Sequence, residues 1–369
     1  MPEGLKRFLK TLFVIIVGIL LAFAGYVAYL LVTYNRIADN QPIEIENNLT
    51  SPALRVGTQY KATTYNIGFG AYTPDYTFFM DEGVMADGTP TVGEHSIAAS
   101  RDSVIACTQG AIGVIAGIRP DFALFQEVDT DSTRSYQVNQ KEAIEKAFPA
   151  SSSAFAVNYH SAFLAYPIPE MHGIVNAGLL TMADEQASSA IRRSYPVDNT
   201  FPTKFFDLDR CFMVERFPVE DGHELVLINS HMSAYDEGGL IRAQQLNMLT
   251  GVMAEERAKG NYVVVGGDWN HALCGSETLY KSAQLIPPWV AVFDDSVLPE
   301  GFSVVRPENL AEVPTCRNND IPYEKDYTYT VTIDGFIVSD NVTATAENID
   351  TGFLYSDHNP VKLTFELGA

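Results

Sequence analysis

The sequence is poor in cysteine and in basic residues, and each shortage argues against a class of protein. Its four cysteines lie far apart, with no C-x-x-C pair, so neither a zinc cluster nor a disulfide-rich scaffold is expected, and one disulfide stays open. Only 24 lysines and arginines stand against 46 aspartates and glutamates, a formal net charge of −22. Because a protein that neutralises nucleic-acid phosphates needs the opposite sign, non-specific DNA or RNA binding is disfavoured.

The composition indicates a packed globular protein. Hydrophobic residues make up 46% of the 369 residues and charged residues 19%, which is too apolar for a disordered chain. The length leaves ample chain for a large core, and one large α/β unit fits it as well as two domains do. No internal repeat or heptad pattern is present.

A long apolar run lies near the N-terminus. Residues 11–32 contain no charged side chain and are long enough to cross a bilayer, so we predict a transmembrane helix after a cytoplasmic segment at residues 1–10. A cleaved signal peptide is the alternative, because three basic residues precede the run and Ala22-Phe23-Ala24 resembles a cleavage site. The run continues past that site, which favours the anchor. The basic residues then keep the N-terminus cytoplasmic, which predicts a single-pass plasma-membrane protein with an extracytoplasmic domain.

The exported part is more acidic than the whole chain. Residues 1–36 hold four basic residues and one acidic residue, so the remainder carries 20 basic against 45 acidic residues, a net charge of −25. Residues 33–57 are polar and without periodicity, which predicts a linker that gives the domain reach from the membrane. Asn48-Leu49-Thr50 and Asn341-Val342-Thr343 match the N-glycosylation triplet, which matters only in a eukaryotic host.

Residues 58–369 are predicted to form one layered α/β domain, because short β-like runs alternate there with longer helical stretches. Segments 58–68 and 121–128 are strand-like, with a helical stretch between them. A second helical stretch lies between the strand-like segments 224–231 and 261–270. Between residues 176 and 230 several β-rich runs are separated only by loops, which predicts antiparallel pairs and therefore mixed sheets.

Polar side chains interrupt the apolar runs at six strand ends, which is how a scaffold brings side chains together at one point. Each has a plain structural explanation when taken alone: Asn66 as a turn residue, His231 as a core histidine, Asp334 as part of a hairpin turn. Together, in strands where an unpaired charge is costly, they indicate a functional site. The candidates are Asn66, Glu127, Asn229, His231, Asp268, Asn270, Asp334, Asp357 and His358.

The ordered series of motifs resembles the endonuclease/exonuclease/phosphatase superfamily of metal-dependent phosphoesterases, over about residues 59–369. The matching segments are TYNIG with Asn66, FQEVD with Glu127, NSHMSAY with His231, GDWN with Asp268 and Asn270, IDGFIVS with Asp334, and SDHNPV with Asp357 and His358. GDWN and SDHNPV are weakly specific alone, whereas the order of the set is strong. The resemblance implies a four-layered αββα sandwich with two mixed β-sheets and a metal site at one edge. It also implies Mg²⁺, or sometimes Mn²⁺ or Ca²⁺.

The chemistry of phosphoester hydrolysis agrees with this resemblance. The site must neutralise phosphate oxygens, activate water and stabilise the leaving alkoxide. Oxygen ligands suit a hard dication, so Glu127 is the principal expected metal ligand, with Asn66 and Asp357 supplying further oxygens directly or through metal-bound water.

The resemblance also implies roles for the other residues. Asp268 would orient or deprotonate the attacking water, and Asn270 would donate to a phosphate oxygen. His358 would bind the phosphate or share the role of base, and Asp334 would fix its orientation. His231 would contact the phosphate and is a candidate to protonate the leaving group.

The substrate is less visible. NSHMSAY is similar to the NSHLAAH-type segment of inositol polyphosphate 5-phosphatases but departs from it after His231, and the residue set is shared with neutral sphingomyelinases and DNase I-like nucleases. Tethering at a membrane favours a small or lipid-headgroup phosphoester. The alternatives are an extracytoplasmic nuclease, which the acidic charge disfavours, and a binding or scaffold protein, which the complete residue set disfavours. Arg210, Arg242 and Arg317 are candidates for phosphate contacts or for structural ion pairs.

Two long irregular segments flank the predicted site. Residues 70–93 follow the first motif, and residues 299–325 precede the strand of Asp334. They are expected to form a lid and a second wall, or else surface loops folded onto themselves.

Overall fold

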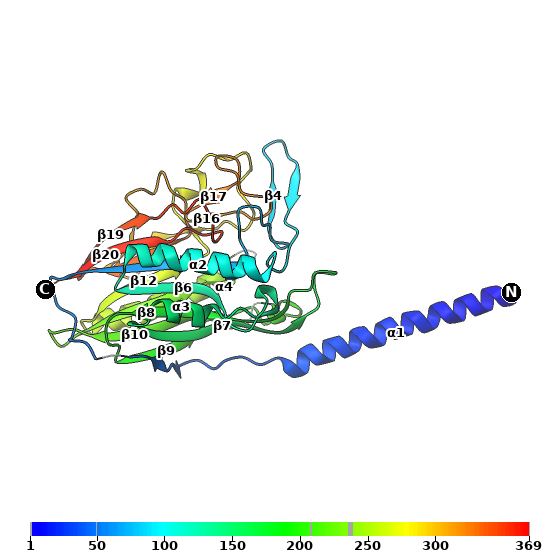
Figure 1. Ribbon diagram of the computed structural model, residues 1–369, viewed down its shortest axis with the longest axis horizontal. Helices are drawn as coiled ribbons and strands as arrows, with labels where there is room; N and C mark the ends of the chain where they lie inside the picture. The colour runs from blue at the N-terminus through cyan, green and yellow to red at the C-terminus, as the bar shows by residue number, and fades with distance from the viewer. Residues whose placement is uncertain (1, 49, 207–208, 235–238, 369) are drawn as a thin grey trace.

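The computed structural model describes residues 2–48, 50–206, 209–234 and 239–368. A long helix, α1 (Glu3–Thr33), leads into an α/β sandwich, and Figure 1 shows the two chain termini at opposite ends of the molecule. Two features of the sequence, Leu49 of the first glycosylation triplet and Tyr235 of NSHMSAY, lie outside the described residues.

Two seven-stranded sheets form the central layers. The first has the order β1-β9-β10-β11-β12-β18-β15, with bounds Gln41–Pro42, Ser189–Ser194, Cys211–Pro218, Glu224–His231, Tyr262–Asp268, Asp334–Ser339 and Phe302–Val305. The second has the order β19-β20-β3-β6-β8-β7-β2, with bounds Val342–Asn348, Val361–Leu367, Gln59–Asn66, Phe122–Asp129, Gly173–Ala183, Ser152–Leu164 and Ile45–Glu46. Each sheet contains one parallel pair, β11/β12 and β3/β6, among antiparallel ones, which confirms the prediction of mixed sheets.

Helices cover the outer faces of both sheets. Helices α2 (Arg101–Ile118) and α3 (Gln140–Ala147) pack on the second sheet, and α4 (Leu240–Ala258) packs on the first. A third apolar cluster fills the space between the sheets. The predicted four-layered αββα sandwich is therefore confirmed (Figure 1).

Short elements complete the fold at the sheet edges. The two-stranded pairs are β4 (Glu82–Val84) with β5 (Pro90–Val92), β13 (Ala272–Leu273) with β14 (Val292–Phe293), and β16 (Cys316–Arg317) with β17 (Thr330–Val331). The 3-10 helices are Gly68–Gly70, Thr133–Ser135, Thr203–Phe205, Ser276–Thr278 and Asp295–Val297. All four cysteines are free.

Alternation along the strands explains the layers. In β3, Tyr60 and Ala62 face the opposite sheet, whereas Tyr65 faces α2, because successive side chains in a strand point to opposite faces. Helix α2 begins after Ser100, whose hydroxyl accepts a hydrogen bond from the Ser103 amide as an N-cap.

The segment predicted as a linker, residues 33–57, differs from a free tether. Its residues 41–42 pair with β9 and its residues 45–46 pair with β7, so it adds an edge strand to each sheet. The Arg36 side chain also donates to the Asp209 carboxylate at 2.8 Å. Polar composition indicated a linker, and backbone hydrogen bonds at open sheet edges hold polar segments as well as apolar ones.

Helix α1 is long and apolar enough to cross a membrane, and most of its side chains are exposed. Its C-terminal part contacts the domain. The Tyr26 hydroxyl accepts from the Ala165 amide and donates to the Phe163 carbonyl, and the Tyr29 hydroxyl accepts from the Phe163 amide. Strand β7 thus reaches the end of the helix.

Candidate active site

Most of the candidate residues lie on the core-facing side of a strand, just beyond its apolar part. Tyr262 and Val264 of β12 lie between the sheets, and Asp268 occupies the same face four residues later. Asn66 continues the inward face of Ala62 in β3, and Asp334 precedes that of Phe336 in β18. Since both sheets end at the same edge here, their terminal polar side chains meet between the layers.

Glu127 breaks this alternation. In β6, Phe122 and Leu124 point inward, so Gln126 is the next inward residue and Glu127 should point out. A β-bulge between Phe125 and Val128 adds a residue, and Glu127 adopts a left-handed φ of 53°. The bulge turns its carboxylate into the site at a backbone cost of order 1–3 kcal/mol, a kind of strain that collects at functional sites.

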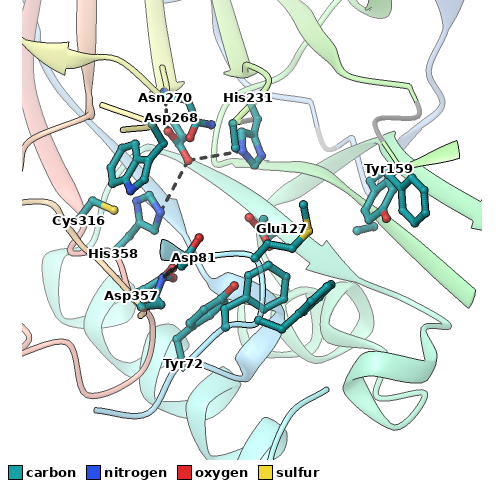
Figure 2. A pocket seen from close by; sticks show the side chains of 18 of the residues that line it. Tyr72, Asp81, Glu127, Tyr159, His231, Asp268, Asn270, Cys316, Asp357 and His358 are labelled. Atoms are coloured by element: carbon teal, nitrogen blue, oxygen red, sulfur yellow. Dashed lines mark hydrogen bonds and ion pairs between the residues drawn. The ribbon is translucent and has the colours of Figure 1, made fainter. Parts of the chain in front are cut away.

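Asp268 lies at the centre of the first group of polar side chains. Its Oδ2 accepts from Asn66 Nδ2 at 3.0 Å and lies 3.4 Å from His231 Nε2 and 3.7 Å from His358 Nε2. Its Oδ1 accepts from the backbone amide of Asn270 at 2.9 Å. Figure 2 shows Asp268 between the two imidazoles on one side of the cavity.

His358 is held by a second carboxylate. Its Nδ1 lies 2.8 Å from Asp334 Oδ2, and both side chains are buried. Thr315 fixes Asp334 in turn, because its hydroxyl accepts from the amides of Ile333 and Asp334. The predicted positioning of His358 by Asp334 is therefore present as a contact.

The charges of this pair follow from the surroundings. Burial alone would lower the pKa of His358, but the carboxylates of Asp334, Asp268 and Asp357 raise it well above its ordinary value. Burial raises the pKa of Asp268 to about 6, against the opposing effect of His358. An imidazolium suited to bind phosphate thus lies beside a carboxylate whose pKa suits a general base near neutral pH.

His231 is held neutral. Burial, Arg210 and His358 lower its pKa well below the ordinary value, and its Nε2 lies 3.0 Å from a guanidinium nitrogen of Arg210. A neutral imidazole that accepts from arginine has no proton on that nitrogen to give. The arrangement gives no support to His231 as a general acid, and Arg210 supplies the positive charge at this corner.

Glu127 and Asp357 lie on the other side of the same cavity (Figure 2). The side chain of Glu127 is 25% exposed; its removal from water and the charge of Asp357 raise its pKa, against Arg134. Asn319 Nδ2 joins Asp357 Oδ2 at 2.8 Å to Asp81 Oδ2 at 3.0 Å. A carboxylate whose pKa is raised by a second carboxylate beside an open cavity belongs to the donor set that a hard dication would bind, so these residues fit a divalent metal.

Asn66 lies between the two groups of carboxylates. Its Nδ2 donates to Asp268 and lies 3.4 Å from Glu127 Oε1, while its Oδ1 accepts from the Gly68 amide. In this arrangement its amide links the two carboxylates, and its oxygen is turned away from them. A ligand role for Asn66 stays a prediction.

A second cluster has the geometry of a metal site but is better explained otherwise. Ligand atoms of Asp268, Asp334 and His358 lie within 4.8 Å of one another. The Nδ1 of His358 is already bonded to Asp334, and its Nε2 lies 3.7 Å from Asp268, so the imidazolium lies between the two carboxylates. Asp334 and His358 are therefore a hydrogen-bonded pair beside Asp268, and Glu127 with Asp357 is the better cation site.

The two sides meet in a cavity of about 200 Å³. Besides the candidates, its lining includes Tyr72, Phe78, Phe79 and Asp81 from residues 70–93 and Cys316, Arg317, Asn318 and Asn319 from residues 299–325. Both irregular segments therefore contribute walls to the cavity, and a lid role for residues 70–93 stays a prediction. Among the predicted residues, Asn66, Asn229 and Asp334 stand behind the lining rather than in it; Asn229 instead bonds to Gln126 Nε2 at 2.8 Å.

Comparisons of the whole chain with known proteins identify its fold. A scan against family models and a search of curated proteins give no match. Among solved structures, an endonuclease/exonuclease/phosphatase from Beutenbergia cavernae is similar with a TM-score of 0.56 and 14% identity, over 84% of this chain and 72% of that one. The chain has the endonuclease/exonuclease/phosphatase fold. This likeness shows the fold, and the chemistry has to be argued from the site.

Two other proteins with the endonuclease/exonuclease/phosphatase fold were solved with ligands. D. rerio TDP2 in complex with a single-strand DNA product has a TM-score of 0.51 and 15% identity, over 84% of this chain and 99% of that one. ANGEL2, a 2′,3′-cyclic phosphatase in complex with adenosine-2′,3′-vanadate, has a TM-score of 0.51 and 13% identity, over 90% and 100%.

On this endonuclease/exonuclease/phosphatase fold, several site residues escaped the sequence reasoning. Arg134 pairs with Asp129 at 2.9 Å, lies 3.8 Å from Glu127 and stacks 4.0 Å over the Phe69 ring. Asp81 and Asn319 come from the two walls. No local sequence pattern marks these residues. An arginine close in sequence to the acidic FQEVD motif is nevertheless a charge pair that could have pointed to Arg134.

The three arginines considered for phosphate contacts divide. Arg210 lines the cavity, and so does Arg317, whose guanidinium donates to the carbonyls of Thr73 and Tyr76. Arg242 donates to the Asn270 carbonyl and positions that loop from behind. Arg210 is therefore the best placed of the three to meet a phosphate.

Proposed function

We propose that the protein is a membrane-anchored, divalent-metal-dependent phosphoesterase that hydrolyses a small or lipid-headgroup phosphoester by attack of water. The observation that carries this is one cavity with two faces. A carboxylate with a pKa of about 6 beside an imidazolium, Asp268 with His358, lies opposite the cation-binding carboxylates of Glu127 and Asp357.

The residues of the chain divide the work. Asp268 accepts the proton of the attacking water, and the Asn66 amide keeps its carboxylate in place. His358, held by Asp334, binds a phosphate oxygen as a cation. One amide hydrogen of Asn270 is bonded to the Met232 carbonyl, and the other donates to the phosphate.

Glu127 and Asp357 would hold the metal, Mg²⁺ or else Mn²⁺ or Ca²⁺, which when bound neutralises phosphate charge and stabilises the leaving oxygen. Arg210 adds positive charge beside His231. Water adds across the P–O bond: its oxygen bonds to phosphorus, the ester oxygen leaves, and a proton ends on that oxygen.

Location supports a membrane substrate over a polynucleotide. Helix α1 has the length and apolarity of an anchor, and the proposed domains are a cytoplasmic segment 1–10, a span 11–32, the segment 33–57 and a catalytic domain 58–369. The three early basic residues support an extracytoplasmic, plasma-membrane location for the domain. The net charge of −25 beyond residue 36 opposes long-range attraction of nucleic acid.

The test is a substrate panel on the full-length protein in detergent. Phosphomonoesters, phosphodiesters, lipid vesicles, plasmid DNA and RNA are incubated with Mg²⁺, Mn²⁺ or Ca²⁺, and with EDTA. We expect metal-dependent hydrolysis of a small or lipid phosphoester that falls at least about a hundredfold in Asp268→Asn. The matched control is Asp87→Asn, an exposed acid in the β4–β5 turn.

Three results would contradict the proposal. Full activity in Asp268→Asn would remove the mechanism, and full activity in EDTA would remove the metal. Degradation of DNA or RNA alone, with a steep salt dependence, would identify a nuclease.

A further inference from the structure

The tip of the β7–β8 hairpin, residues 163–174, is unusually apolar for a surface loop. Its exposed side chains are Phe163, Tyr166, Ile168, Met171 and Ile174, with 36%, 61%, 75%, 38% and 41% of their surface accessible. A contiguous group of this kind marks an interaction site on a soluble domain. We call residues 163–174 the apolar tip.

The apolar tip carries almost no charge that would oppose a lipid environment. Glu170 is its one carboxylate, and this group is turned back to the domain, where it accepts from the Ser96 amide at 2.6 Å and lies 3.6 Å from His95. His172 is buried, and burial lowers its pKa to about 3, so it is neutral. Glu170, whose side chain is 33% exposed and bonded back to the domain, is therefore the one charged group of the apolar tip.

Contacts with α1 set the position of the apolar tip along the proposed membrane span. Tyr26 and Tyr29 of α1 bond to the backbone of Phe163 and Ala165. Tyr26 lies six residues before Val32, the end of the proposed span, which is about 9 Å along a helix. Phe163 and Ala165 are thus beside a part of α1 that lies inside the proposed span, at a depth that belongs to the leaflet on the domain side.

The inner side of the apolar tip belongs to the catalytic cavity. Leu164, Tyr166 and His172 line it together with Phe79 and Phe206, and the rings of Phe79 and Tyr166 meet edge to face at 5.7 Å. The cavity therefore runs from the metal-binding carboxylates to an apolar wall beside α1. A ligand that fills it has a phosphate at one end and an apolar body at the other.

We propose that the apolar tip inserts into the leaflet that α1 leaves, and that the substrate is a phospholipid drawn from that leaflet along the Tyr166 wall into the cavity. This inference rests on the proposed function and narrows its substrate to a lipid phosphoester. A membrane, a protein partner or a second copy could cover the apolar tip. We choose the membrane because the contacts with α1 hold the apolar tip beside the proposed span.

Insertion is measured on the full-length protein in vesicles that contain brominated phosphatidylcholine, which quenches tryptophan inside a bilayer. Ile168→Trp is compared with Glu220→Trp, and the wild-type signal of Trp269 and Trp289 is subtracted. Position 220 is in the β10–β11 turn, which Tyr262 links to the C-terminal end by bonds to Asp221 and Gly368. We expect blue-shifted, quenched emission at position 168 and neither at position 220. The same emission and quenching at both positions would overturn insertion. That result is expected if a protein partner or a second copy covers the apolar tip.

Substrate delivery is tested with Ile168→Glu against the conservative Ile168→Leu. Ile168 lies outside the cavity lining, so both variants should hydrolyse soluble bis(p-nitrophenyl) phosphate or p-nitrophenyl phosphate like the wild type. On vesicles of phosphatidylglycerol and phosphatidic acid, we expect Ile168→Glu to release water-soluble phosphorus about tenfold more slowly, and Ile168→Leu to match the wild type.

The outcomes separate the two proposals. Unchanged vesicle hydrolysis in Ile168→Glu, with soluble hydrolysis intact, overturns the inference and leaves the proposed function standing. Quenching at position 168 without hydrolysis of any phosphoester supports insertion and overturns both the proposed function and the substrate assignment. If Ile168→Glu misfolds, it also loses hydrolysis of the soluble substrates. The comparison of Ile168→Trp with Glu220→Trp then decides the inference.

Discussion

Glu215 gives the protein a pH-dependent stability that can be worked out from its surroundings. It lies in the middle of β10, opposite Ala190 and Leu227, on the face that packs against the other sheet. Its side chain is buried, and its Oε1 has no hydrogen-bond partner among the described residues. Burial raises the pKa of Glu215 to about 7, only partly opposed by a hydrogen bond with Thr181.

The sign follows from proton binding. The folded protein keeps the Glu215 proton up to about pH 7, whereas the unfolded chain releases it near 4.5, so the folded state binds more protons between these values. The contribution of Glu215 to the free energy of unfolding is therefore highest below pH 4.5 and falls as the pH rises towards 7. The full loss is about 3 kcal/mol, and about 2.5 kcal/mol of it falls between pH 5 and pH 8.

The assay compares the wild type with Glu215→Gln, which keeps the shape and removes the charge. Urea unfolding of the full-length protein in detergent, followed by tryptophan fluorescence, gives the free energy of unfolding at pH 5 and pH 8. Other groups titrate in both proteins and cancel, so we expect the wild type to lose about 2.5 kcal/mol relative to the variant. The same difference at both pH values would refute a neutral, buried Glu215.

Three further predictions concern the site. Gly68→Ala should lower kcat at least about tenfold with little change in Tm, because a Cβ there would lie 2.4 Å from Tyr72 Cδ2 and 2.9 Å from Asp357 Oδ1, at a φ of 50°; wild-type kcat would contradict it. Asp334→Asn should lower the pKa of His358, seen as an imidazole titration by NMR, and raise KM more than Asp87→Asn does; an unmoved titration would remove the pairing. Glu127→Gln should weaken Mg²⁺ binding about 10–100-fold in calorimetry while exposed Glu94→Gln does not, and equal affinities would place the cation elsewhere.

The sequence predicted the sheets and most of the site for a physical reason. Alternation within an apolar strand fixes which side chains face the core, and polar side chains at the ends of such strands marked Asp268 and Asp334 as candidates; the family resemblance implied that they meet at one edge. The confirmed mixed sheets follow from the same pattern together with loop lengths. The strands of these sheets are short, apolar and bounded by turn residues, so few other assignments of secondary structure fit the sequence.

The remainder depended on contacts that spacing does not encode. Strict alternation places Glu127 on the outer face, and only the bulge brings it inward. Arg134, Asp81 and Asn319 enter from loops whose paths are set by packing against other elements. The edge strands within residues 33–57 form because two sheets offer open edges, which the polar segment itself does not reveal.

The bond from Asn66 to Asp268 joins residues 202 positions apart, on strands of different sheets. Neither half of the chain contains the complete catalytic group, because Asn66 and Glu127 come from the first half and Asp268 and His358 from the second, so chemistry begins only when the two layers have docked. Turnover therefore reports on completion of the whole sandwich, and a refolding chain should regain it in step with its last long-range contacts rather than with its first secondary structure.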